Sequence, residues 1–245
     1  MKLSNKVLAI IWDFDGTIAN TWNKNYNVTK NIIRSILKTD HNAFPVLDSV
    51  ETYHSAHTKA VNWREFYKDS FRMSESQVDE AGRLWTEYQL KDQTPVELIN
   101  GVEDTISSLK NFPHGIVSQN SREGIIRYLK QKNILNYFQT VVGYEEVHIT
   151  RQKPHPDGLL TCVERLVDSE SGYVFFIGDH ETDAQCVKNA NEVLIDNKSE
   201  IKILSIGAFY GFNVDTTNWN LLPDYEAKYA GEIKSIVEKF IAAND

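Results

Sequence analysis

The chain of 245 residues has little cysteine, no long apolar run and no excess of positive charge. Its two cysteines, Cys162 and Cys186, are too few for a disulfide framework and lack the CxxC spacing of a metal or redox site. We interpret both as helix or core residues, because free cysteine packs as a small apolar side chain. The first apolar run, Val7–Trp12, is too short for a signal sequence or a membrane-spanning helix. The sequence therefore predicts a cytoplasmic protein with no membrane partner.

The charge balance also limits the partners of the protein. Lys and Arg total 26 against 34 Asp and Glu, which gives a formal net charge of -8. Proteins that bind nucleic acid usually carry a basic field or stripe, so this balance argues against a nucleic-acid partner. An acidic protein can still bind a phosphate, because local geometry decides the field inside a pocket. The length is sufficient to bury a sizeable core in one large domain or two smaller ones.

Short apolar blocks alternate with helical periodicity over most of the chain. The blocks are rich in Val, Ile and Phe, and helix-spaced apolar residues fill the gaps between the later ones. This alternation predicts an α/β fold with a parallel sheet covered by helices on both faces, a three-layer Rossmann-like core. A final amphipathic helix is expected around residues 233–241. The expected strands cover residues 7–12, 115–117, 140–143, 173–177 and 203–208.

The stretch from about residue 21 to residue 94 departs from this pattern. It holds no Val/Ile-rich strand but has helix-spaced apolar and aromatic residues, and Ser74 with Gln77 forms a capping-box start. A helix opening after Gly101 returns the chain to the core. We therefore predict two domains, an α/β core of residues 1–18 and 96–245 and an inserted helical domain of residues 19–95.

Two carboxylates follow the first expected strand. Asp13 and Asp15 come directly after the apolar run and are followed by Gly16 and Thr17. In open parallel sheets, ligands bind at the carboxyl ends of the strands. Two acids so close repel each other unless a cation or hydrogen bonds hold them, which is typical of a catalytic or metal site. The alternative is that Asp15-Gly16-Thr17 is only a turn.

A hydroxyl and a lysine follow later in the chain. Ser118-Gln119-Asn120 ends the second expected strand just before a helix start, where free backbone N–H groups favour an anion. Ser121 is interpreted as an ordinary N-cap. Lys153 precedes Pro154 and Pro156, which restrict the backbone, and a cation held there neutralises a phosphoryl group. A solvated surface lysine is the alternative.

A third acid ends the fourth expected strand. Asp179 emerges at the same edge as Asp13, so carboxylates from two neighbouring strands can share Mg²⁺, which prefers oxygen ligands. Asp183, four residues further on, either supports that metal or caps a helix. His180 has no second histidine at ligand spacing and is interpreted as a loop residue.

Together these segments resemble the haloacid dehalogenase superfamily of phosphohydrolases, and particularly its phosphoglycolate phosphatase-like members. The resemblance covers the chain from Val7 to about Gly211, and the helical insertion is similar to the cap domain of that family. The matching segments are Asp13-Phe14-Asp15-Gly16-Thr17, Ser118, Lys153-Pro154-His155-Pro156 and Gly178-Asp179 with Asp183.

The resemblance implies a role for each matching residue. Asp13 would be the nucleophile that forms an aspartyl-phosphate, and Asp15 the general acid and then base. Ser118, the Gln119 backbone N–H and Lys153 would hold the phosphoryl oxygens. The metal would be Mg²⁺, bound by Asp13, the carbonyl of Asp15, Asp179 and Asp183. The implied substrate is a small phosphorylated metabolite, and a monomer or homodimer is typical of such proteins.

Two departures and several alternatives remain at this stage. Many relatives have Asn directly after the hydroxyl residue, where this chain has Gln119, so Asn120 is a candidate substitute. Residues 193–197 also lengthen the segment before the fifth strand. Within the superfamily the alternatives are a sugar phosphomutase, a phosphonatase with a cap lysine and a dehalogenase. Asp15 argues against the dehalogenase, which does not need a second acid. From another class, the alternative is a catalytically silent binding protein, against which the presence of both Asp13 and Asp15 argues.

Overall fold

The computed structural model describes residues 4–60, 62–168, 171–211 and 214–244. The chain divides into two compact units. The α/β unit comprises the described residues up to Asn20 and from Leu98 onward, and the helical unit comprises Thr21–Glu97. No helix among the described residues combines the length and apolar character needed to cross a membrane.

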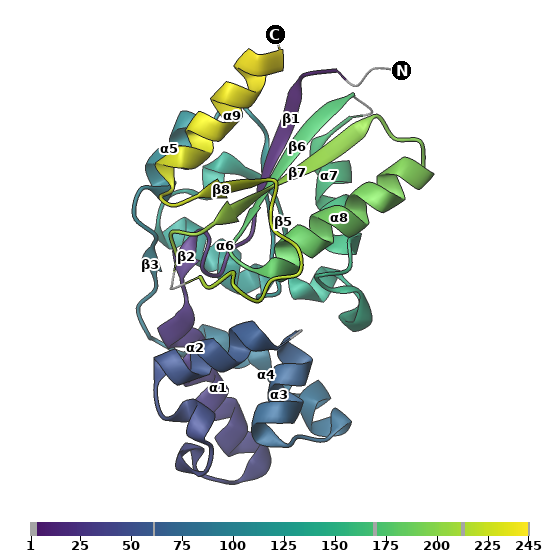
Figure 1. Cartoon of the computed structure of the whole chain (residues 1–245). Coiled ribbons are helices and arrows are strands. Elements are labelled where there is room, and N and C mark those ends of the chain that lie inside the picture. The colour runs from purple at the N-terminus through teal and green to yellow at the C-terminus, as the bar shows by residue number, and fades with distance from the viewer. Residues whose placement is uncertain (1–3, 61, 169–170, 212–213, 245) are drawn as a thin grey trace. The chain divides into compact units, whose positions relative to one another are not determined.

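The α/β unit contains a parallel sheet of six strands in the order β5-β4-β1-β6-β7-β8 (Figure 1). Strand β1 (Val7–Trp12) lies at the centre, between β4 (His114–Val117) and β6 (Gly172–Gly178). Every residue of β1 is buried, because helices cover both faces of the sheet, and this explains its uninterrupted apolar run. The other strands are β5 (Phe138–Val142), β7 (Ile201–Ala208) and β8 (Tyr225–Ala227).

Helices form the two outer layers of this unit, as Figure 1 shows. On one face, α7 packs against β4 and β5, and α8 packs against β6 and β7. On the other face α5 packs against α9, and the ring of Phe240 in α9 contacts Phe175 in β6. Both cysteines are buried, Cys162 in α7 and Cys186 in α8, as predicted. The helices are α5 (Val102–Ser108), α6 (Arg122–Gln131), α7 (Asp157–Leu166), α8 (Glu181–Asp196) and α9 (Gly231–Asn244), with short 3-10 turns at Leu135–Tyr137, Tyr144–Glu146 and Ile149–Arg151.

The predicted α/β fold class is confirmed, with corrections at the element ends. All five expected strands are present, and β4, β5, β6 and β7 begin earlier than the apolar blocks indicated. Residues 193–196 are not an extra connection but the last turn of α8. Strand β8 was not predicted, because three residues after a polar loop give too short a pattern.

The described residues of the helical unit form four α-helices around an aromatic core. Ser74 accepts a hydrogen bond from the backbone of Gln77 and the Gln77 side chain returns to the backbone of Ser74, so the predicted capping box starts α4. The buried rings of Tyr53, Phe66 and Phe71 pack edge to face. The elements are α1 (Trp22–Leu37), α2 (Val50–Lys59), α3 (Trp63–Phe71) and α4 (Glu75–Lys91), with 3-10 turns at His41–Ala43 and Pro45–Leu47. A two-stranded sheet, β2 (Ala19–Asn20) with β3 (Glu97–Leu98), lies where the chain enters and leaves this unit.

Candidate active site

Three strand tips of the α/β unit carry the polar residues that the sequence singled out. Asp13 follows β1, Ser118 follows β4 and Asp179 follows β6, all at the carboxyl edge of the sheet. The backbone N–H of Asp13 donates to the carbonyl of Ile177 at 2.7 Å, and that of Ser118 donates to Val142 at 3.0 Å. These bonds continue the sheet by one residue, so the functional side chains project from a rigid frame.

Three carboxylates converge at this edge. Asp13, Asp179 and Asp183 each offer an oxygen within 4.8 Å of the others. Asp13 is 5% exposed and Asp183 is 4% exposed, so water screens their mutual repulsion poorly. The structure thus brings together the side chains that were expected to meet from two separate strands.

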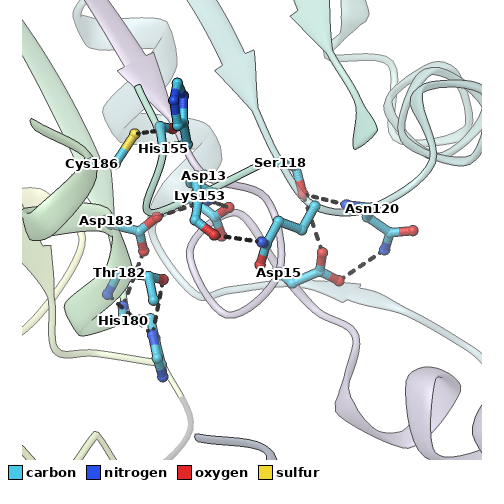
Figure 2. A network of polar contacts seen from close by, with 11 residues as sticks. Asp13, Asp15, Ser118, Asn120, Lys153, His155, His180, Thr182, Asp183 and Cys186 are labelled. Carbon is cyan, nitrogen blue, oxygen red and sulfur yellow. Dashed lines mark hydrogen bonds and ion pairs between the residues drawn. The ribbon is translucent and has the colours of Figure 1, made fainter. Parts of the chain in front are cut away.

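Lys153 reaches into the same cluster. Its Nζ donates to Asp13 Oδ1 at 2.5 Å and to Asp183 Oδ1 at 2.7 Å (Figure 2). Only 7% of Lys153 is exposed, and its ammonium also lies over the ring of Phe176. The alternative of a solvated surface lysine is therefore wrong for this residue.

The electrostatics show that one ammonium does not balance the carboxylates. Burial raises the pKa of Asp13 to about 7; Lys153 opposes that rise, while Asp183 and Asp15 add to it. Burial and the charge of Asp13 also raise the pKa of Asp179 well above its usual value. Burial disfavours the ammonium of Lys153, but Asp13 and Asp183 outweigh that effect and raise its pKa. The excess of buried negative charge, offered entirely by oxygen ligands, fits a divalent cation such as Mg²⁺.

Asp15 lies on the other side of Asp13, toward β4. Ser118 Oγ donates to Asp15 Oδ2 at 3.3 Å, and Asn120 Nδ2 donates to Asp15 Oδ1 at 3.0 Å. Gln119 turns away, because its side-chain amide donates to the backbone carbonyl of Lys153 at 2.9 Å. Asn120 was considered only as a candidate substitute for Gln119 and was not among the predicted site residues. The signal for it in the sequence was that Gln119 stands where many relatives have Asn.

Asp183 caps a helix, which is one of the two uses that the sequence left open, and its carboxylate also belongs to the acidic cluster. Its Oδ2 accepts from the backbone N–H of His180 at 3.1 Å, which completes a capping box at the start of α8, while Oδ1 binds Lys153. His180 is the N-cap residue, and its Nδ1 accepts from the backbone of Thr182 at 3.2 Å. His180 is therefore the N-cap of α8 rather than the loop residue that the sequence predicted.

Glycines leave room for the carboxylates. Gly16 has a φ of 77°, and a Cβ there would lie 2.0 Å from Asp179 Oδ2. A Cβ on Gly178 would lie 2.3 Å from Asp183 Oδ2. Larger residues at either position would displace a carboxylate, so these glycines are part of the site rather than of a generic turn.

The segment after β7 also contacts the first motif, which the sequence did not predict. The hydroxyl of Tyr210 donates to the backbone carbonyl of Thr17 at 3.2 Å. A Cβ on the next residue, Gly211, would lie 2.4 Å from the carbonyl oxygen of Gly16. Tyr210 and Gly211 therefore pack closely on the turn that carries Asp15.

This fold and this cluster agree with the comparison against known families. The family model described as haloacid dehalogenase-like hydrolase matches residues 10–195, a range that includes the carboxylate cluster, Ser118, Asn120 and Lys153. The chain belongs to this family of hydrolases, so the resemblance drawn from the sequence motifs is confirmed.

The individual relatives share about a third or less of their residues with this chain over the matched segments. The chain is 26% identical over 197 residues to the pyrophosphatase PpaX of Listeria monocytogenes, covering 77% of this chain and 82% of that protein. It is 32% identical over 114 residues to the phosphoglycolate phosphatase of Escherichia coli, covering 46% of this chain and 40% of that protein. A haloacid dehalogenase-like hydrolase structure from Streptococcus pneumoniae superimposes with a TM-score of 0.65 at 19% identity, over 94% of this chain and 98% of that one. At that identity the structural likeness shows the fold.

Proposed function

We propose that this protein is a Mg²⁺-dependent phosphatase that hydrolyses a small phosphomonoester through an aspartyl-phosphate. One observation carries the proposal: Asp13 and Asp179 converge from neighbouring strand tips, and Lys153 lies buried against Asp13. Membership of the hydrolase family and the phosphatase names of relatives support the same reaction.

The two acids of the first motif divide the chemistry between them. A carboxylate oxygen of Asp13 attacks phosphorus, and the bond from phosphorus to the leaving oxygen breaks. Asp15, protonated in this step, gives its proton to that oxygen. In the second step Asp15 takes a proton from the water that attacks the aspartyl-phosphate, which releases inorganic phosphate and restores Asp13.

Donors around Asp13 would hold the phosphoryl oxygens. Ser118 Oγ, the backbone N–H of Gln119 and Lys153 Nζ would donate to these oxygens as the phosphoryl group meets the nucleophile. Lys153 already contacts Asp13, so its positive charge lies beside the atoms where negative charge builds up in the transition state. The barrier to phosphoryl transfer is lowered mainly by such positioning and charge neutralisation.

Asp13, the carbonyl oxygen of Asp15, Asp179 and Asp183 would hold Mg²⁺. When bound, the cation supplies neutralising charge between the carboxylates and the phosphate. Burial raises the pKa of Asp13 and of Asp179, which supports this ligand set because a bound cation would offset the cost of burying their charges.

The inserted domain, predicted from the sequence as residues 19–95 and corresponding to the helical unit Thr21–Glu97, is proposed as the cap that selects the substrate. A short-chain acid phosphate, a sugar phosphate or a nucleotide fits a cap of this size. Cytoplasmic location and a monomeric or homodimeric state are further parts of the proposal. Pyrophosphate belongs in any substrate screen, because a relative is named for its hydrolysis.

The test is phosphate release from a panel of phosphorylated metabolites and aryl phosphates, with Mg²⁺ and with EDTA. Asp13→Asn should lower the rate by about 10³-fold or more, since it removes the nucleophile. EDTA should abolish phosphate release by the unaltered protein. The control variant Asp168→Asn, at an exposed position, should release phosphate in Mg²⁺ at the same rate as the unaltered protein. Unchanged activity of Asp13→Asn would refute the covalent role.

The same panel separates the alternatives. A silent binding protein would release no phosphate from any compound. A mutase would move the phosphoryl group between sugar positions without net release. To detect a phosphonatase, a carbonyl-containing phosphonate is added to the panel: a phosphonatase would cleave its carbon–phosphorus bond and would lose activity when borohydride is added together with that substrate, because borohydride reduces the imine.

A further inference from the structure

Asn120 makes a contact at the site that the family motifs do not account for. Its side-chain Nδ2 donates to Asp15 Oδ1 at 3.0 Å, while Ser118 Oγ donates to the other carboxylate oxygen, Oδ2, at 3.3 Å (Figure 2). Asn120 is 7% exposed and Ser118 is 4% exposed, so both contacts lie away from bulk water.

Asn120 is itself held firmly. Its Oδ1 accepts from the backbone N–H of Ser121 at 2.7 Å, and its own backbone N–H donates to Ser118 Oγ at 3.1 Å. Its backbone carbonyl accepts from the N–H of Tyr144 at 3.1 Å. The Ser121 N–H can only donate, so the amide oxygen must face it and the NH₂ group must face Asp15. The amide orientation is therefore determined by chemistry on both sides.

The two donors to Asp15 differ in what else they can do. Ser118 is a hydroxyl whose O–H can rotate, and in the proposed function it turns toward a phosphoryl oxygen when substrate binds. Asn120 cannot turn in this way without breaking its bond to Ser121. When Ser118 rotates, Asp15 Oδ2 loses a donor while Oδ1 keeps the Asn120 amide.

We propose that Asn120 is the positioning residue of the Asp15 general acid, and that it makes Oδ2 the oxygen that carries the transferred proton. This inference rests on the proposed phosphatase function. With Oδ1 held by the amide, the proton sits on Oδ2 and passes to the leaving-group oxygen as the phosphorus–oxygen bond breaks, leaving Asp15 as a carboxylate. The neighbouring Gln119 does not make this contact, because its side-chain amide donates to the Lys153 carbonyl.

Leaving groups of different basicity provide the test. A good leaving group such as p-nitrophenolate needs little proton donation, whereas an alkoxide needs it strongly. We expect Asn120→Ala to lower kcat for an alkyl phosphate by about 10- to 100-fold and kcat for p-nitrophenyl phosphate by only about threefold or less. Both KM values should change little, because Asn120 does not bind the phosphoryl group.

Asn191→Ala is the matched control. Its side chain bonds the backbone of Ile203 through both Nδ2 and Oδ1, so it is an equally engaged asparagine of the same unit, remote from the strand tips. Its effect on activity should be independent of the leaving group. If Asn120→Ala lowered both rates by the same factor, the inference would be overturned and Asn120 would be a structural residue.

Two further measurements keep the test decisive if Asn120→Ala folds poorly. Asn120→Asp keeps the size and the acceptor for Ser121 but removes the donor to Asp15, so wild-type rates on the alkyl phosphate would contradict the proposal. In an Asp15→Asn background, Asn120→Ala should cause no further leaving-group-dependent loss. An unaltered protein that hydrolyses no phosphomonoester would instead count against the proposed function itself.

Discussion

The two units of this protein satisfy their buried polar groups in opposite ways. In the helical unit, Thr29 Oγ1 lies 3.1 Å from the hydroxyl of Tyr53 and 3.2 Å from that of Tyr67. The Gln89 amide donates to Asn25 Oδ1 at 2.6 Å. Among the described residues of this unit, no Asp, Glu, Lys or Arg is classed as buried. These buried hydroxyls and amides are neutral and bond one another.

The α/β unit instead buries charge that it does not neutralise. Asp13 and Asp183 share the single ammonium of Lys153, and Asp179 adds a third carboxylate beside them. Neutral polar pairs of the first kind specify packing, and they call for no ligand. An excess of one charge at a rigid sheet edge is costly unless a ligand of opposite charge binds there. This difference between the two units indicates that the ligand-binding site belongs to the α/β unit.

Removing Lys153 tests the comparison most severely. Above pH 7, where both carboxylates are charged, Lys153→Met should lower the free energy of unfolding in EDTA by about 3–5 kcal/mol, because two buried carboxylates lose their partner. Added Mg²⁺ should recover part of the loss by binding the folded state. Urea denaturation with and without Mg²⁺ measures both effects. Lys234→Met, on the exposed face of α9, should change the free energy by about 0.5 kcal/mol or less. Equal losses in the two variants would contradict the charge-excess interpretation.

His114 sharpens the comparison, because it is a buried titratable group of the α/β unit outside the carboxylate cluster. Trp12 Nε1 donates to its Nδ1 at 3.0 Å, so Nε2 carries the proton and faces the Leu109 carbonyl at 3.0 Å. Burial lowers the pKa of His114 to about 4, partly opposed by the Leu109 carbonyl. The ring is therefore neutral when folded and protonated more readily when unfolded.

The direction of the pH effect follows from that difference. Between pH 6.5 and 4 the unfolded state binds the extra proton, so the contribution of His114 is complete above pH 6.5 and is lost as the pH falls toward 4. The loss should reach about 3 kcal/mol across that window. Urea denaturation at pH 7 and pH 5 should show a smaller pH dependence in His114→Gln than in the unaltered protein. His148→Gln, at an exposed position, should show the unaltered dependence; an unaltered dependence in His114→Gln as well would contradict the assignment.

The smallest expected effect lies in the helical unit. Thr29→Val keeps the shape of the side chain but removes a partner from the hydroxyls of Tyr53 and Tyr67, which should cost about 1–2 kcal/mol. Thermal unfolding followed by circular dichroism measures the change. Thr39→Val, at an exposed position, provides the control. Because these contacts are structural, Mg²⁺ should not alter the loss; a loss that Mg²⁺ reverses would show that the two units do not differ as described.

Local patterns predicted most of the framework. The buried run Val7–Trp12 could only be a strand covered on both faces, and the Ser74–Gln77 pair fixed the start of α4 within one turn. Strand β8 and helix α2 (Val50–Lys59) escaped prediction because one is three residues long and the other has few apolar residues. Short or mostly polar elements form because of what they pack against, and a local pattern does not contain that information.

The amino-acid sequence was enough to determine the candidate chemistry, since residue types and their order placed Asp13, Asp15 and Asp179 after strands of a parallel sheet and Lys153 shortly before a helix. The tertiary structure alone decided which side chains share a proton or a charge: Lys153 bridges Asp13 and Asp183, Asn120 holds Asp15, and Tyr210 binds the Thr17 carbonyl. These pairs are separated by 30 to 193 residues, and their meeting depends on strand order and helix packing. Hydrogen bonds act over about 3 Å, so only the folded chain selects the partners.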